Sequence, residues 1–199
     1  EDYRKQALRL RQARRKAAPK LSATVSASMQ GLGMAGGVFE VQINELTQPQ
    51  RHGLDEVVFL VAGHPGSTPR PMGKVASGGE LSRIALAIAV TTSRLGTAQT
   101  LIFDEVDAGV GGAVADTVGR LMKQLGRDRQ VLAVTHLPQV AAQGNHHLKV
   151  SKSQAGDKTV SQVQTLGRSE RVEEVARMLG GATITDTTRR HARELLEQH

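Results

Sequence analysis

Apolar residues recur along the middle of the chain in two periods, and each period predicts its own kind of element. In residues 77–95 they return every three or four positions, which is the spacing of one face of a helix. Short continuous apolar runs at 100–103 and 130–134 predict buried strands, and the amphipathic stretch 112–125 between them predicts a helix. Strand, helix and strand in this order predict a right-handed crossover and a parallel sheet.

The flanking segments predict further strands and helices around this unit. Residues 38–43 alternate between apolar and polar side chains, as in a half-buried strand, and residues 57–61 form a continuous apolar run that predicts a more buried one. Residues 63–73 hold three prolines and predict an irregular loop. Towards the C-terminus the pattern predicts a short helix, two edge strands and two closing helices, at 138–142, 147–151, 159–165, 170–179 and 185–198. The predicted fold class is α/β, with a mostly parallel sheet flanked by helices.

The first 18 residues contain no glycine or proline and are rich in strong helix formers. Apolar side chains recur there at spacings of three and four, at Tyr3, Ala7, Leu10, Ala13 and Ala17. So narrow a stripe on a charged helix is typical of a coiled-coil arm or of a helix that lies on a neighbour. Pro19 suits the first position of a second helix, because its missing N–H would be unpaired there. We therefore expect an arm at 1–18 and a globular part at 19–199.

Composition excludes several classes of protein. The chain has 199 residues, 39% of them hydrophobic, and no run of eighteen apolar residues, which argues for a soluble protein without a membrane span. It contains no cysteine, so it has neither a disulfide framework nor a cysteine metal site, and this fits a reducing cytosol. Only 2% of the residues are aromatic, which argues against a platform that stacks the bases of single-stranded nucleic acid.

The positive charge is concentrated at the N-terminus. The formal net charge is +7, and residues 1–20 alone carry eight basic against two acidic side chains. The remaining residues are nearly neutral, so the charge belongs to the predicted arm. Two interpretations stay open: a solvated basic helix face, or an interaction with DNA phosphates. The second would use Arg4, Lys5, Arg9, Arg11, Arg14, Arg15 and Lys16.

Ser77-Gly78-Gly79-Glu80 opens the helix predicted at 77–95. Ser77 as N-cap and Glu80 three residues later would form a capping box without any ligand. A capping box does not need two glycines, each of which lowers helix propensity. Paired glycines clear side chains from the exposed N–H groups at the positive end of a helix, and a phosphate can then approach. We interpret this segment as a phosphate-binding helix start.

Asp104 and Glu105 end the apolar run at 100–103. Side chains at the carboxyl ends of parallel strands open into the crevice where α/β proteins bind ligands. Asp104 suits a Mg²⁺ ligand, directly or through water, and Glu105 suits the base that orients and deprotonates an attacking water. An acidic turn after a strand is the alternative explanation.

His136 ends the second apolar run and would lie on the same rim as Asp104 and Glu105. A histidine on its own is more often structural than catalytic. This placement distinguishes His136 from the other six histidines, to which we assign no role.

A phosphate-binding P-loop is not found. Residues 66–74 resemble one at a glance, but six residues separate Gly66 from Gly73, and Val75 stands where the motif has a hydroxyl residue. The predicted site therefore lacks the loop that usually holds the nucleotide phosphates.

Together these segments resemble the motifs of ABC-type ATPases. Ser77 to Glu80 resembles the signature motif, Leu101 to Glu105 the Walker B strand, Asp107 to Gly109 the D-loop, and His136 the switch histidine. Within that group, residues 74–83, 104–112, 134–142 and 176–181 are similar to the RecN family of bacterial, SMC-like ATPases of double-strand-break repair. The resemblance covers the chain from about residue 21 onwards, with the basic helix in the place of a descending coiled-coil arm.

The resemblance implies the C-terminal lobe of an ABC/SMC-type ATPase head, with ATP and Mg²⁺ as cofactors. It implies that Asp104 binds the metal and that Glu105 and His136 are catalytic, on nucleotide held by the same head. Ser77, Gly78, Gly79, Glu80 and Asp107 would be nucleotide-binding, with Ser77 to Glu80 reaching the γ-phosphate held by an opposite head.

The implied partners are an N-terminal lobe that carries the Walker A loop, a second copy of the head, and DNA, in the bacterial cytoplasm at the nucleoid and not at a membrane. The chain alone should then be inactive as an ATPase. Two alternatives remain: a catalytically silent module that dimerises or binds DNA, and a head lobe of another SMC-like or ABC-type ATPase.

Overall fold

The computed structural model describes residues 1–74, 77–93, 95–155, 158–181 and 183–198. Val75, which argued against a P-loop, lies outside the described residues. The elements follow the order α1 (Asp2–Gln30), β1 (Val38–Gln50), β2 (Gly53–Ala62), β3 (Arg70–Pro71), η1 (Met72–Lys74), α2 (Gly78–Thr91), β4 (Thr100–Phe103), α3 (Gly112–Leu125), β5 (Gln130–Ala133), α4 (Pro138–Gln143), β6 (Leu148–Ala155), β7 (Lys158–Thr165), α5 (Arg168–Gly180) and α6 (Asp186–Glu197).

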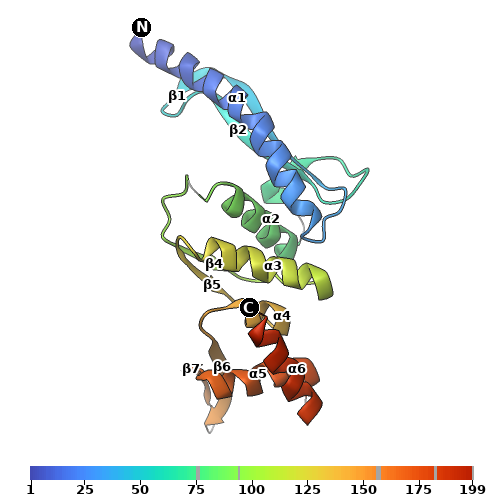
Figure 1. Ribbon diagram of the computed structural model, residues 1–199. Helices are drawn as coiled ribbons and strands as arrows, with labels where there is room; N and C mark the ends of the chain where they lie inside the picture. The colour runs from blue at the N-terminus through green and yellow to red at the C-terminus, as the bar shows by residue number, and fades with distance from the viewer. Residues whose placement is uncertain (75–76, 94, 156–157, 182, 199) are drawn as a thin grey trace.

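The molecule is elongated, and its elements follow one another along its length (Figure 1). Helix α1 and the β1–β2 hairpin form one end, α2, α3, β4 and β5 form the middle, and β6, β7, α5 and α6 form the other end. No helix in the described part of the chain combines the length and the hydropathy that a membrane crossing requires.

Helix α1 continues through Pro19, so the predicted helix start at that residue is wrong. A proline inside a helix removes one backbone hydrogen bond and crowds the preceding turn. Packing offsets this cost, because Ala18, Val25 and Met29 of the same helix are buried against the rest of the protein. Of the predicted apolar stripe, Ala7 is buried, whereas Tyr3 and Leu10 are more than 40% exposed.

The expectation of a mostly parallel sheet is wrong for the described residues, which form three small sheets. Strands β1–β2–β3 and β6–β7 are antiparallel, and only β4 and β5 pair in parallel. The reason lies in the short connections: β2 begins three residues after β1 ends, β7 begins three residues after β6 ends, and so short a link can only join antiparallel strands. Helix α3 lies between β4 and β5 in the sequence, as predicted.

The strands β4 and β5 occur where the sequence predicts them, but only one face of them is covered. Ile102 is 69% exposed, Leu132 is 42% exposed, and Val134 just beyond β5 is 62% exposed. Parallel sheets are normally covered on both faces, and nothing in the described residues covers these side chains. The apolar runs thus predicted the correct elements, but the burial that they predicted is wrong for one face of the two strands.

Two hydrophobic cores hold the chain together. The larger joins α1, the β1–β2 hairpin, α2, α3 and α4 through residues such as Met29, Phe39 and Ile84, all at most 1% exposed. The smaller joins α5 to α6 around Val175 and Ala192. Between them, Arg171 of α5 donates to backbone carbonyls at the end of α4.

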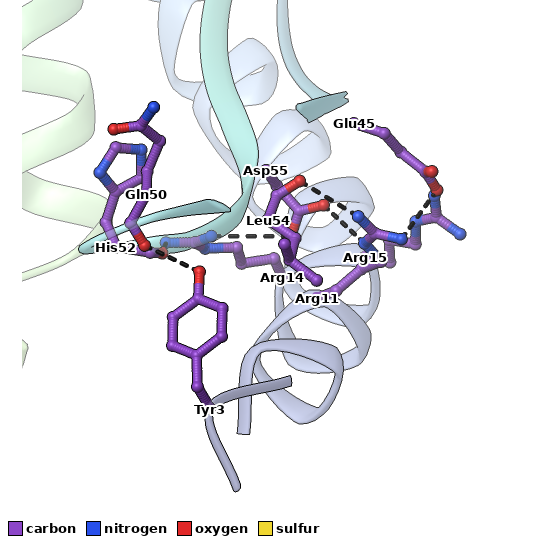
Figure 2. Close-up of polar contacts among 9 residues, drawn as sticks. All are labelled: Tyr3, Arg11, Arg14, Arg15, Glu45, Gln50, His52, Leu54 and Asp55. Carbon is purple, nitrogen blue, oxygen red and sulfur yellow. Dashed lines mark hydrogen bonds and ion pairs between the residues drawn. The ribbon is translucent and has the colours of Figure 1, made fainter. Parts of the chain in front are cut away.

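The arm half of α1 is attached to the hairpin by a buried ion pair (Figure 2). Arg11 Nε donates to Asp55 Oδ1 at 2.6 Å, and Arg14 Nη1 lies 3.6 Å from Asp55 Oδ2, while the Asp55 side chain is fully buried. Glu45 accepts from Arg11 and Arg15 at 3.0 and 2.9 Å at the exposed rim of this ion pair. Three of the arm's arginines therefore face the hairpin.

Candidate functional site

Helix α2 begins with its predicted N-cap. Ser77 has extended backbone angles, and its Oγ accepts a hydrogen bond from the Glu80 N–H at 3.4 Å. The Glu80 carboxylate lies 3.6 Å from Nε2 of His64, in the loop that follows β2. The first turn of α2 therefore presents backbone N–H groups, with Glu80 turned towards the hairpin.

The two glycines after the cap pack against the loop that follows β4. A Cβ on Gly78 would clash with Oε2 of Glu105, and a Cβ on Gly79 would lie 2.9 Å from the Ala108 carbonyl oxygen. Access for a phosphate is one explanation for both glycines. Their close packing gives a second reason: the loop can approach the helix only where side chains are missing.

Asp104 and Glu105 stand exposed at the carboxyl end of β4, directly beside the start of α2. Asp104 Oδ1 accepts from the Glu105 N–H at 2.9 Å. Glu105 has a φ of 55°, the only non-glycine residue in the described chain with a positive φ. Such a conformation is strained for a glutamate, and strain of this kind collects at functional sites.

His136 follows β5, and the loop after β4 holds it through Asp107. The Asp107 carboxylate is 2% exposed and accepts from the Thr135 hydroxyl and, at 3.1 Å, from the His136 backbone N–H. The His136 side chain itself is 69% exposed, with Nδ1 3.4 Å from Asp107 Oδ2. The structure thus brings the ends of β4 and β5 together, as the parallel pairing requires.

Two further residues, which the sequence argument missed, tie α2 to the same loop. Ser82 Oγ donates to the Asp104 carbonyl at 2.6 Å, and Arg83 donates to the Ala108 carbonyl at 2.8 Å. Arg83 is only 5% exposed; its burial lowers the pKa of the guanidinium, and the Glu80 carboxylate partly raises it again. A signal existed, since an arginine four residues after Gly79 lies on the buried face of α2.

The predicted site residues therefore lie along one edge of the molecule. Ser77, Gly78 and Gly79 open α2, Asp104 and Glu105 end β4, and His136 follows β5. Gly79 and Asp107 are the exceptions, because both lie buried beneath that edge. The arrangement combines helix N–H groups, two exposed carboxylates and one exposed imidazole, which suits the handling of a phosphate.

The residues present fit a magnesium ion whose ligands come partly from the protein and partly from a nucleotide. Among the described residues, no three histidine, aspartate or glutamate side chains are grouped so that they could hold a metal by themselves. Mg²⁺ in nucleotide sites is usually bound by one or two carboxylates, with phosphates and water completing the shell. Asp104, exposed at the end of β4, can supply one such carboxylate.

Nearly the whole chain matches curated bacterial proteins called DNA repair protein RecN. The identity is 46% over 198 residues with the protein of Xylella fastidiosa strain 9a5c, and 42% over 198 residues with that of Haemophilus influenzae. With the protein of Vibrio cholerae it is 44% over 192 residues. These matches cover 94–99% of the chain but only 34–36% of each relative, so the chain spans about a third of their length.

Solved SMC head domains share the fold. The head from Pyrococcus yayanosii, with its coiled coil and joint, matches with a TM-score of 0.57 and 23% identity over 78% of this chain and 28% of that one. The head from Pyrococcus furiosus, bound to the C-terminal domain of ScpA, matches with a TM-score of 0.54 and 23% identity over 80% and 36%. No protein-family model matches the chain. Sequence identity and fold thus agree with the motifs along the edge: the chain belongs to the RecN family, and its fold is that of SMC head domains.

Proposed function

We propose that this chain is the half of an ATPase head that acts on nucleotide bound by another lobe, in an SMC-like protein of DNA double-strand-break repair. The observation that carries the proposal is the shared edge: α2, β4 and β5 bring Ser77, Asp104, Glu105 and His136 together. Direct bonds from Ser82 and Arg83 hold α2 against the loop after β4. The edge has no P-loop of its own in the sequence.

Each side chain on the edge has a chemical role in this proposal. Mg²⁺, when bound with ATP, neutralises charge on the phosphates. Asp104 would provide its protein ligand. Glu105 would orient the attacking water and accept its proton, and His136 would bind the phosphate that is transferred. The exposure of all three side chains leaves them accessible to a nucleotide.

The exposed face of β4 and β5 supports a missing lobe as the partner that brings the nucleotide. Ile102, Leu132 and Val134 present an apolar surface that an isolated two-stranded parallel sheet would not leave in water. The relatives are about three times as long as this chain, so they contain further sequence that could cover it. We assign this face to the N-terminal lobe with the Walker A loop.

The start of α2 supports pairing with a second head. Ser77 and Gly78 are exposed at this helix start, and Gly78 lies beside Glu105, where a phosphate brought by another molecule could approach the helix N-terminus. Hydrolysis would then depend on the pairing of two heads, each of which completes the site of the other. This composite arrangement predicts that the chain alone does not hydrolyse ATP.

Turnover of Mg-ATP tests the proposal directly. We expect no steady-state turnover by this chain alone, and measurable turnover when it is joined to the N-terminal lobe of the same protein. In the joined form, Glu105→Gln should abolish turnover while nucleotide binding remains, because the amide cannot accept the proton of water. Glu56→Gln makes the same charge change at an exposed position of β2 and should leave turnover intact. Activity of the lone chain, or activity that survives Glu105→Gln, would contradict the proposal.

Binding of DNA is the second part of the proposal, and the structure divides the arm's cations into two groups. Arg11, Arg14 and Arg15 face the hairpin and bind its carboxylates. On a helix of 3.6 residues per turn, a second group lies together on the opposite side, and its members are all exposed. This outer basic stripe consists of Lys5, Arg9, Lys16 and Lys20.

The affinity for duplex DNA, measured at several salt concentrations, distinguishes binding by the outer basic stripe from attraction by net charge alone. Changing its four residues to Gln should weaken binding, and the slope of log affinity against log salt should fall by about one for each phosphate that the variant no longer neutralises. A matched variant removes the same charge from exposed arginines elsewhere, at Arg120, Arg127, Arg190 and Arg193. An equal reduction of affinity in the two variants would show that net charge, and not the stripe, attracts DNA.

A further inference from the structure

Asp107 carries the only buried side chain among the residues of the edge, and its surroundings are specific. Its Oδ2 accepts from the Thr135 hydroxyl and from the His136 backbone N–H, and it lies 3.4 Å from the His136 ring at Nδ1. All three interactions come from the two consecutive residues that lead away from β5. The Thr135 hydroxyl also accepts from the Leu137 N–H at 3.0 Å, which fixes the turn around His136.

These interactions argue against a direct role in nucleotide binding. A carboxylate that is 2% exposed has almost no surface left for a ligand. Its negative charge would also repel a phosphate at close range. His136 has the opposite character, because its side chain is 69% exposed and only Nδ1 faces Asp107. The other ring nitrogen, Nε2, lies on the far side of the imidazole.

We propose that Asp107 is a positioning residue that orients His136, with the ring turned so that Nδ1 faces the carboxylate and Nε2 faces the reacting phosphate. A carboxylate beside Nδ1 favours a proton on that nitrogen, and this fixes which face of the ring meets the substrate. Arg83 fixes the carboxylate in turn, because it holds the carbonyl of the next residue, Ala108. The inference rests on the proposed function in one respect, namely that His136 acts on the nucleotide.

The state of the His136 ring can be measured in the chain itself, without nucleotide. Long-range ¹⁵N–¹H correlation spectra of ¹⁵N-histidine protein report which ring nitrogen carries the proton. We expect His136 to hold a proton on Nδ1, and Asp107→Asn to shift the population towards the Nε2–H form. Asp128→Asn is the matched control, because it makes the same charge change at the exposed turn before β5, the opposite end of that strand. An unchanged His136 spectrum in folded Asp107→Asn would overturn the inference.

A second variant keeps the test decisive if Asp107→Asn does not fold. Thr135→Val removes one donor to the carboxylate and leaves Asp107 in place, so the His136 ring should change in the same direction and by less. Thr135→Ser keeps the hydroxyl and should leave the spectrum as in the wild type. Spectra of Thr135→Val and Thr135→Ser that cannot be told apart would count against the inference.

Turnover in the form joined to the N-terminal lobe separates positioning from binding. Asp107→Asn should lower kcat by about ten- to a hundredfold with little change in KM, as expected for a residue that orients a reacting group. A rise in KM with kcat unchanged would mean that Asp107 binds nucleotide instead, and overturns the inference. An inactive wild-type joined protein would refute the proposed function, whereas the ring measurement would still decide the role of Asp107.

Discussion

Gly79 lies so close to the loop after β4 that the missing side chain determines how α2 meets that loop. A Cβ there would lie 2.9 Å from the Ala108 carbonyl oxygen and 3.0 Å from the Ala108 Cβ. We expect Gly79→Ala to lower the free energy of unfolding by about 1–3 kcal/mol, because the backbone of the loop must move. Chemical denaturation measures this difference.

The control for Gly79 is a glycine with space around it. A Cβ on Gly73 would meet no atom within 4 Å, so Gly73→Ala should change the free energy of unfolding by no more than about 0.5 kcal/mol. If the two variants were equally stable, the close approach of Gly79 to Ala108 would not matter for how α2 is held.

Sequence patterns found the residues of the edge but not their conformations. The apolar run before Asp104 and Glu105 placed these residues at a strand end, which is where they lie. The positive φ of Glu105 and the burial of Asp107 had no local signal, because both depend on how the loop packs against α2 and on Thr135 and His136. Arg83 was missed since its partner, the Ala108 carbonyl, is a backbone atom 25 residues away.

At the scale of the elements, the attachment of α1 to the hairpin depends on one buried carboxylate. Asp55 lies between Arg11 and Arg14, and loss of its charge would leave Arg14 without its carboxylate and Arg11 with only the exposed Glu45. We expect Asp55→Asn to lower the free energy of unfolding by on the order of 3 kcal/mol. Hydrogen exchange should increase in the first half of α1 and in β2, because these two segments are no longer held together by the ion pair.

Glu45 provides the comparison for Asp55 within the same attachment. Its side chain is 60% exposed, although it also pairs with Arg11 and with Arg15. Exposed ion pairs contribute little, so Glu45→Gln should cost no more than about 1 kcal/mol. A destabilisation as large as that of Asp55→Asn would mean that burial is not what makes the Asp55 pair important.

The elements themselves were largely predictable, and two boundaries differ from the prediction. Residues 112–125 form α3 as predicted, because its apolar spacing is unambiguous over four turns. Helix α2 ends at Thr91, four residues before the predicted end. The start predicted at Pro19 was wrong because Ala18 and Val25 pack against other elements, and tertiary packing outweighs local propensity.

At the scale of the whole molecule, the Glu174 carboxylate links α5 to β6 at the C-terminal end, and acid should neutralise this carboxylate. The hydrogen bonds from Arg177 lower the pKa of Glu174 to about 2; burial opposes this shift, and Lys149 of β6 adds to it. Because the pKa falls on folding, Glu174 stabilises the fold fully above its ordinary pKa near 4.5, and this contribution is lost as the pH falls towards 2. The wild type should therefore lose stability in that window.

Urea midpoints measured from pH 7 to pH 2 for the wild type and for Glu174→Gln check this prediction. The difference between the two proteins should be constant above about pH 5 and shrink below it. Glu173→Gln removes a neighbouring carboxylate whose side chain is 48% exposed, and it should keep the acid sensitivity of the wild type. A difference between wild type and Glu174→Gln that does not depend on pH would contradict this role for Glu174.

Whether a strand is buried depends on what packs against it, and the sequence of the strand itself does not show that. Ile102 and Val134 lie in apolar runs that are typical of buried strands, yet both side chains are more than 60% exposed. The apolar pattern indicates that these residues are suited to a sheet covered on both faces, but no described residue packs over their side chains. Burial was therefore predicted correctly where a described element covers the strand, as at Phe103.

The continuity of α1 has a mechanical consequence. Its 29 residues make a rod about 44 Å long, at 1.5 Å per residue. One end is fixed in the main core by Val25 and Met29, and the hairpin is clamped along the rod by Asp55. A rod of that length turns a rotation of about 10° at the core into a displacement of about 8 Å at its free end. A small rotation of the main core would thus become a large displacement of the N-terminal end of α1.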